Sequence, residues 1–481
     1  MKLQTLTSPS HENLQPMLNE SIYHFLVEFQ NGRTDFSELS SIFFRLIQTM
    51  TDPPLEFIWF YSALTFHTAN STDVTNSHTH LLSVKDLFHS LVSFRNLSDC
   101  SYFKQVSIVA PVLYVLVKCR FEISRVNVEI ESLTDTIVSY ILMCCENVLV
   151  EEQVVEKSMV DWVGVVPVWI ADQVRENGGR VDGLQLFLPL SNEDIRRGID
   201  GECGMDYLAA IVMIEAFLFR LCLMFDSGSC RMELCKDVKS YAVQVIKGFK
   251  KNSTFVVMLF KLLLEPSLPV AELLSTTDEL FLRQLLFEVA LDLGSFLTCD
   301  AYSQLSDVKY KELVILWLFV SNSAFHFASE NGDNARGDCY RNAFTGSQLP
   351  HQIISWVTGM TTIKPTAPDI SSPNDIIDWL LVLEKQGQKI CDVSISELHV
   401  KALKYKSMGI NNEVNGCKTM VEDAPVSING RRKRDSAGFG EVQKQIKVMK
   451  CCHENLCDDS FQGKNEVGNS VPDQEMVDMV W

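Results

Sequence analysis

The sequence lacks the short motifs that identify the common enzyme classes. Its 481 residues contain no G-x-S-x-G, no P-loop, no G-x-G-x-x-G after a strand, no H-E-x-x-H and no protein-kinase motifs. Each of these patterns places a nucleophile, a phosphate cradle or a metal ligand at a required spacing. Nothing in the sequence therefore supports naming a reaction, and we expect no catalytic residue, no cofactor, no metal and no enzymatic activity.

A secretory signal and a disulfide framework are also missing. The first residues, MKLQTLTSPSHENLQ, hold no apolar run of the kind that a signal peptide needs. The 15 cysteines are odd in number and scattered, and Cys144, Cys145 and Cys222 fall inside apolar stretches. This usage is typical of free thiols in a reducing compartment. We expect the protein in the nucleus and cytoplasm.

Positive charge is scarce. The chain has 42 Lys and Arg against 61 Asp and Glu, for a net charge of −19. A long acidic body repels phosphate backbones, which argues against broad nucleic-acid binding. Its surface favours basic or extended segments of partner proteins instead.

The sequence has no convincing β-hairpin pattern. It contains a series of amphipathic segments with helix-capping residues, which predict an all-α fold. One helix is expected to be kinked by Pro111, and the segment 160–174 is either a short strand or a broken helix, of which we predict the helix. Thr276 with Glu279 is expected to form a capping box. The predicted helices are 12–30, a stripe from Phe36 to Met50 capped by Thr34, 55–68, one starting at Ser83, 102–119, 122–150, 204–225, 233–250, 253–264, 276–297, 307–328, 348–359, 372–385 and 394–406.

The chain is organised around Gly204–Phe225, which is apolar on every side except at Asp206, Glu215 and Arg220. A segment of this length and composition is either the buried centre of a large helical body or a membrane span. We predict burial, because two ionised groups in mid-membrane are costly and the flanks lack an aromatic belt and a one-sided basic cluster. Glu215 and Arg220 are then expected to meet partners on neighbouring helices, the alternative being a catalytic carboxylate.

Segments rich in helix-interrupting residues divide the chain. A flexible N-terminus (1–11) precedes an N-terminal helical half (12–175), a glycine-rich hinge loop (176–203), a C-terminal helical half (204–406) and a tail (407–481) that is expected to be disordered. The lengths and short links of the helices over residues 12–406 resemble an irregular armadillo- or HEAT-type α-solenoid. The resemblance implies long grooves for protein partners.

The tail carries the sharpest short signal, Arg431, Arg432, Lys433 and Arg434. Four consecutive cations resemble a monopartite nuclear localisation signal, which an import receptor would bind, although such a run also serves solubility. Ser436 behind them is a candidate phosphorylation site, since a phosphate there would counter the cations.

Two groups of residues have the chemistry of metal ligands. Cys451, Cys452, His453 and Cys457 have the residue types of a zinc site, but adjacent cysteines rarely converge on one ion, and free thiols are the simpler interpretation. The histidines near residues 67–89 (His67, His78, His80 and His89) lack an i, i+4 pair on a helix. Neither group predicts a metal site.

Three functions fit these observations. The first is a non-catalytic helical-repeat scaffold or adaptor that binds proteins, at least partly in the nucleus and without a membrane anchor. The second is a nuclear factor in chromosome or RNA metabolism that touches nucleic acid through its basic tail. The third is an all-α enzyme or a small-ligand carrier.

Overall fold

The computed structural model describes residues 14–70, 77–93, 101–122, 128–146, 162–173, 182–199, 204–225, 231–297, 307–360 and 368–403. All of these residues belong to one compact unit, within residues 1–417. The described residues contain helices and turns and no strand, which confirms the all-α class.

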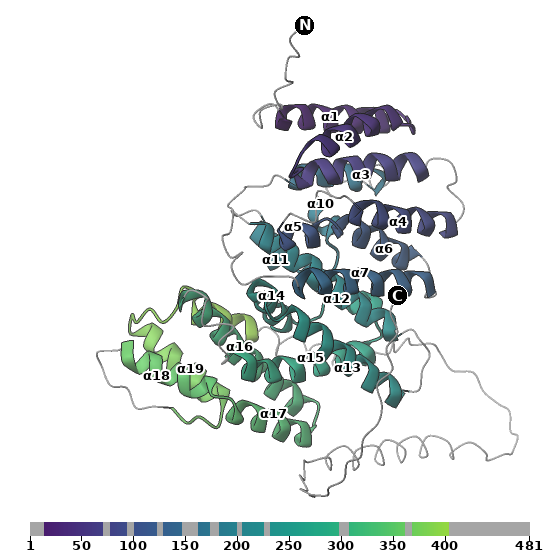
Figure 1. Ribbon diagram of the computed structural model, residues 1–481. Helices are drawn as coiled ribbons and strands as arrows, with labels where there is room; N and C mark the ends of the chain where they lie inside the picture. Colours follow the sequence, from purple (N-terminus) through teal and green to yellow (C-terminus); the bar gives the residue numbers. More distant parts are fainter. Residues whose placement is uncertain are drawn as a thin grey trace, which may run out of the picture. The chain divides into compact units, whose positions relative to one another are not determined.

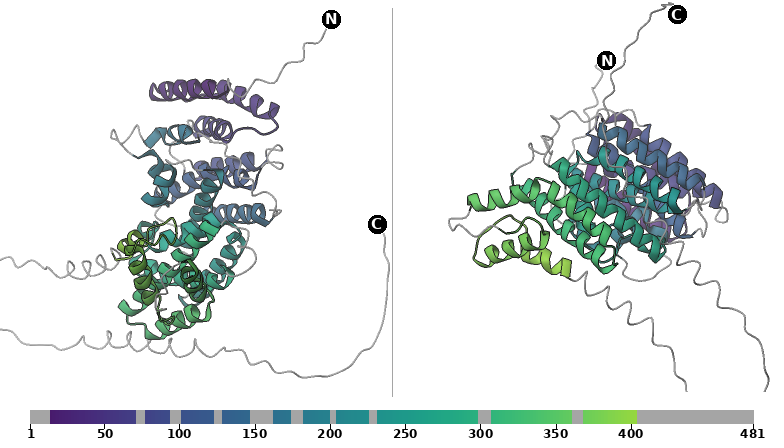
Figure 2. Two further views of the ribbon diagram at one scale, coloured as in Figure 1. Left: turned by 90° about the vertical axis from the view of Figure 1, so that its left-hand side faces the viewer. Right: turned by 90° about the horizontal axis from the view of Figure 1, so that it is seen from below.

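The first helices stack in successive layers (Figure 1; Figure 2, left). α2 packs on α3, α3 on α4, and α4 on α6. This order of contacts is consistent with an irregular solenoid, because helices close together in the chain cover one another. The layers comprise α1 (Leu14–Gln30), α2 (Ser37–Thr49), α3 (Leu55–Asn70), α4 (Ser77–Val92), α5 (Tyr102–Ser107), α6 (Ala110–Glu122) and α7 (Val128–Glu146).

The helix that was expected to be kinked at Pro111 is divided there into two helices, α5 and α6. Proline lacks a backbone N–H and is tolerated in the first turn of a helix, and α6 accordingly starts at Ala110. The broken helix predicted at 160–174 is also confirmed, as the 3₁₀ turn η3 (Trp162–Val165) followed by α8 (Val166–Trp169).

α12 (Met205–Phe225) lies at the centre of the unit, as its uniform hydrophobicity predicts. It packs against α5, α6 and α7 from the earlier part of the chain and against α11, α13 and α14. Every residue from Leu208 to Leu223 is buried, including Glu215 and Arg220. Burial of the large apolar side chains contributes about 1.5–3 kcal/mol each.

The later helices gather around α16 (Asp307–Glu330), which contacts α14, α15, α17, α18 and α19. Their bounds are α13 (Arg231–Phe249), α14 (Ser253–Leu263), the short η4 (Ala271–Leu273), α15 (Thr276–Leu297), α17 (Asn334–Gly346), α18 (Leu349–Met360) and α19 (Pro373–Lys385). A last helical stretch covers residues 395–403.

Several predicted boundaries were wrong. α4 begins at Ser77 and not at Ser83. The N-terminus of α15 is capped by Ser275, whose Oγ accepts the N–H of Asp278 at 3.1 Å, so the capping box is displaced by one residue from the predicted Thr276 and Glu279. α17 was not predicted.

The predicted hinge loop contains two short helices, α10 (Gly183–Phe187) and α11 (Glu193–Ile199). Phe187, Leu188, Leu190, Ile195 and Ile199 are buried there, so this stretch packs as part of the body. The division of the chain into two halves at 176–203 stays a prediction.

Candidate functional site

The residues that the sequence singles out in the tail lie outside the described residues. These are the proposed import signal, the candidate phosphorylation site and the cysteine-rich group: Arg431, Arg432, Lys433, Arg434, Ser436, Cys451, Cys452, His453 and Cys457. Their roles stay predictions.

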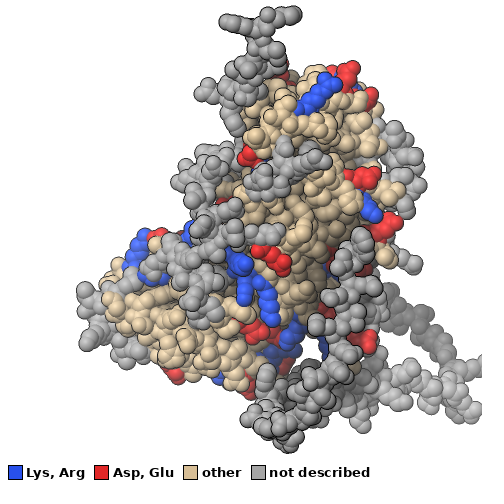
Figure 3. Space-filling model, in the orientation of Figure 1, with Lys and Arg blue, Asp and Glu red and all other residues tan. Residues whose placement is uncertain are grey.

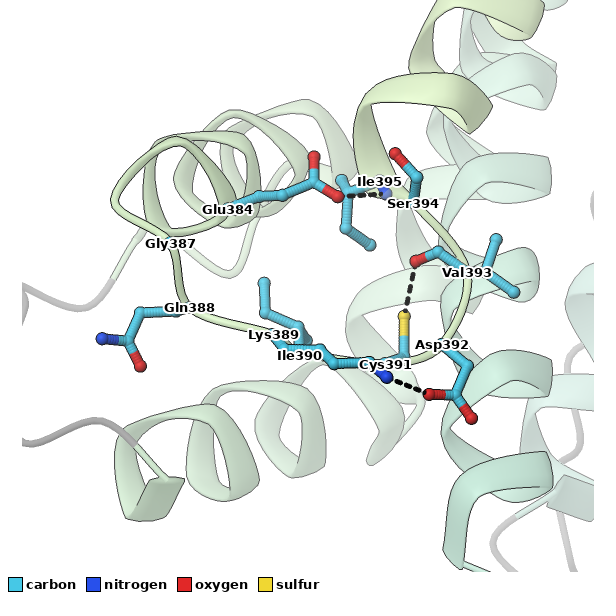
Figure 4. A pocket seen from close by; sticks show the side chains of 10 residues that line it. All are labelled: Glu384, Gly387, Gln388, Lys389, Ile390, Cys391, Asp392, Val393, Ser394 and Ile395. Atoms are coloured by element: carbon cyan, nitrogen blue, oxygen red, sulfur yellow. Dashed lines mark hydrogen bonds and ion pairs between the residues drawn. The ribbon is translucent and has the colours of Figure 1, made fainter.

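A pocket of about 300 Å³ lies in the loop that follows α19 (Figure 4). Its one glutamate, Glu384, accepts hydrogen bonds from the backbone N–H groups of Ile395 (2.9 Å) and Ser396 (2.8 Å) and from the Ser396 hydroxyl. Desolvation raises the pKa of this carboxyl, but the bonds from Ser396 and Ile395 outweigh it and leave the pKa below its ordinary value. Glu384 therefore serves as the N-terminal cap of the 395–403 helix.

Three further polar side chains of this pocket are bound within the loop. Lys389 pairs with Asp392 at 2.6 Å, and the Cys391 thiol donates to the carbonyl oxygen of Val393 at 3.1 Å (Figure 4). Burial raises the pKa of Cys391 to about 11, so its thiol is protonated near neutral pH and is a poor nucleophile. The pocket thus shows a folded turn with its charges paired.

His67 is a packing residue. Its ring lies against Phe25 and Phe29 of α1, at centroid distances of 5.5 and 5.1 Å, and its Nε2 is 2.8 Å from the carbonyl oxygen of Val168. Desolvation lowers the pKa of His67, which favours the neutral ring. In the part of the chain that the structure describes, no group of three or more His, Cys, Asp or Glu is arranged to hold a metal ion.

Partners on neighbouring helices were expected for Glu215 and Arg220 of α12, and Arg220 has them. Arg220 donates through Nη2 to the Asp135 carboxylate of α7 at 3.0 Å and pairs with Glu131 of the same helix at 3.1 Å. Its guanidinium also lies 5.5 Å from the ring centroid of Tyr241 on α13. This cluster holds three helices together.

Glu215 has a different environment. Its Oε1 accepts the N–H of Leu190 at 3.1 Å, from the loop between α10 and α11. Burial raises the pKa of Glu215 to about 8, so the side chain is mostly a neutral acid near pH 7. Glu215 is therefore not the ion that the sequence predicted: its hydrogen bond comes from a loop, although the charge of Arg196 on the neighbouring α11 lowers its pKa.

Among the described residues, three helical stretches are long and apolar enough to cross a bilayer, judged by length and composition. They are Tyr102–Phe121, Met205–Phe225 and Val308–Glu330, and 78%, 89% and 78% of their most apolar windows are buried. The burial of Met205–Phe225 agrees with the predicted core helix.

Sequence reasoning missed the ion-pair cluster that joins α13, α15 and α17. Glu288 of α15 pairs with Lys239 at 2.9 Å and with Arg336 at 3.4 Å. These residues lie far apart in the sequence, and no local spacing signals their meeting.

Comparison with known proteins assigns no family to this chain. No protein-family model, no curated protein and no solved structure matches the chain.

Proposed function

We propose that this protein is a non-catalytic helical scaffold that binds protein partners, at least partly in the nucleus. The partition of charge along the chain supports the proposal most directly. Residues 1–403 carry 49 Asp and Glu against 31 Lys and Arg, a net charge of −18, whereas residues 404–481 carry −1. An acidic helical body attracts basic segments of other proteins and repels nucleic acid.

The exposed side chains suit protein contacts. Acidic groups such as Glu193 and Asp338 lie at the surface, with 70% and 69% of their side chains exposed, although each also pairs with an arginine of its own helix. Exposed apolar residues lie on several helices, among them Tyr23, Ile42, Met143, Met232 and Val382. Figure 3 shows small groups of charged residues separated by uncharged surface on one face. Mixed surfaces of this kind are typical of non-obligate protein interfaces.

Capture of partners with the intact chain tests the scaffold proposal. We expect recovered proteins to bind through Lys- and Arg-rich segments and to dissociate as salt screens the attraction. Synthetic peptides of such a segment, with a charge-reversed peptide as the matched control, should reproduce the binding. Equal affinity for both peptides would contradict the proposed acidic docking surface.

Nuclear entry is tested by replacing Arg431–Arg434 with alanine in a tagged protein and imaging the cell. The matched control replaces Lys444, Lys447 and Lys450, which removes positive charge from the same tail without touching the cluster. We expect the first variant alone to lose nuclear accumulation. A Ser436→Glu variant should weaken accumulation, because it places negative charge beside the cations.

The four cations also favour the second function, contact with nucleic acid through the tail. Salt-dependent DNA and RNA binding of the intact chain, compared with a chain that lacks residues 430–450, distinguishes the two. Tight binding that the deletion abolishes would favour the nucleic-acid function, since four phosphate contacts would give a steep salt dependence.

A further inference from the structure

The segment 182–199 joins helices that precede it in the chain. Phe187 lies at the end of α10. Its ring centroid is 5.4 Å from that of Trp59 in α3 and 5.4 Å from that of Tyr114 in α6. These three aromatic side chains are buried. One end of the segment is therefore fixed to the first layers of the unit.

The same segment is fixed to helices that follow it. The Tyr207 hydroxyl of α12 donates to the carbonyl oxygen of Ile195 at 2.9 Å, and Lys401 in the 395–403 helix pairs with Asp194 of α11. The segment 182–199 thus bridges earlier and later parts of the unit, and its attachment to α12 is the central contact of the bridge.

Glu215 lies at that central contact. Its side chain leaves the middle of an apolar helix, is 1% exposed, and receives the N–H of Leu190, which is itself buried. An ionised carboxylate in this position would lose its hydration and gain one backbone hydrogen bond, which does not compensate a buried charge. The protonated acid fits the site better.

Arg196 of α11 is the charged group that acts on Glu215. Its Nη1 donates to the carbonyl oxygen of Ser191, and its Nε lies 3.7 Å from Asp182, so the guanidinium is held within the bridging segment. Charged and titratable groups on other helices packed against α12 have partners of their own: Lys104 with Asp52, Lys118 with Asp172, Glu131 and Asp135 with Arg220, Tyr241 over Arg220, and Lys261 with Glu312.

We propose that Glu215 makes the attachment of the 182–199 segment to α12 depend on pH, so that the bridge is tightest in mild acid and loosens toward neutral and weakly alkaline pH. This pH-dependent attachment goes beyond the proposed scaffold function and does not depend on it.

The direction follows from proton linkage. When the segment detaches, Glu215 becomes hydrated and returns toward its ordinary pKa of 4.5, whereas in the attached state burial holds the pKa near 8. Detachment therefore releases a proton between these values. The ratio of detached to attached segment rises up to about tenfold for each pH unit in that window and levels off above it.

Amide hydrogen exchange of the full chain between pH 5 and 8 tests this pH-dependent attachment, after correction for the intrinsic rise of exchange with pH. We expect the protection of the 182–199 amides to fall about tenfold per pH unit in the wild type. In Glu215→Gln, which keeps an acceptor for Leu190 without a titrating group, protection should be flat. Glu233→Gln, at an exposed site in the first turn of α13, is the matched control and should keep the wild-type slope.

A second variant distinguishes titration from simple packing. Arg196 lowers the pKa of Glu215, so Arg196→Gln should extend the sloping region to higher pH, whatever its effect on overall protection. A wild-type profile without slope, a slope that survives in Glu215→Gln, or an unshifted profile in Arg196→Gln would overturn the proposal. If the Glu215→Gln chain did not fold, infrared titration of the wild-type carboxyl band would decide whether a buried acid stays protonated at pH 7.

Discussion

An added methyl group at Gly294, in the C-terminal part of α15, should clearly destabilise the fold. A Cβ at this position would meet three ring atoms of Trp317 in α16 at 2.7–2.8 Å. Ordinary carbon contacts lie at about 3.5–4.0 Å, so the ring would have to move by about 1 Å. Trp317 is fully buried and stacks on Phe344 of α17 at 5.4 Å, which blocks that movement.

Two opposing effects set the magnitude for Gly294→Ala. Overpacking of a dense core costs about 1–3 kcal/mol. Alanine in a helix interior is favoured over glycine by about 1 kcal/mol. We expect a net loss of roughly 1–2 kcal/mol, with the clash prevailing because the neighbouring ring is held on its other side.

Urea unfolding followed by far-ultraviolet circular dichroism measures the effect as a lower midpoint. Gly337→Ala in α17 is the matched control, because the nearest atom to its added Cβ is Ala328 Cβ at 3.9 Å, and it should raise the midpoint. In a Trp317→Phe background the smaller ring should remove most of the cost of Gly294→Ala. A Gly294→Ala chain as stable as the wild type, or the same cost in both backgrounds, would refute the reasoning.

Three further changes have directions that follow from the structure. Leu218→Ala in the buried centre of α12 should cost about 2–5 kcal/mol through the cavity that it leaves, measured by thermal unfolding. Asp135→Asn should lower the free energy of unfolding by about 1–3 kcal/mol because it weakens the ion pair with Arg220, and the loss should lie toward the lower end because the Asp135 side chain is 44% exposed. Adding Arg220→Met to this variant should lower the free energy of unfolding by an amount that differs from its effect in the wild type. Because burial lowers the pKa of His67, the native state resists protonating it, so stability should fall as pH drops below the ordinary value of 6.5. Unfolding midpoints across that range should depend less on pH in His67→Gln.

Long apolar helices could be predicted from the sequence because a helix that is apolar on every face is expected to be buried. α12 was expected at 204–225 and occupies Met205–Phe225. α17 was missed because its buried apolar residues are only Tyr340 and Phe344, too few to give a helical period. Its start is marked by Asp333, whose side chain accepts the N–H of Arg336 at 3.1 Å.

The surroundings of Glu215 could not be predicted from spacing. A carboxyl in an apolar helix indicates a buried acid, but its state depends on which groups approach it from elsewhere. The Leu190 N–H does so from a stretch whose glycines and single proline, Pro189, predicted a loop. That stretch folds into α10 and α11 in part because Phe187 is buried against Trp59 and Tyr114, on helices distant in sequence, which no local propensity encodes.

The pairing of Lys401 with Asp194 joins positions 207 residues apart. At synthesis rates of about 5–20 residues per second, α11 leaves the ribosome roughly 10–40 s before its partner exists. During that interval Asp194 can pair with Arg197 of its own helix, at 3.3 Å, but not yet with Lys401. The order of translation thus makes the pairing of α11 with Lys401 a late contact in the assembly of this fold.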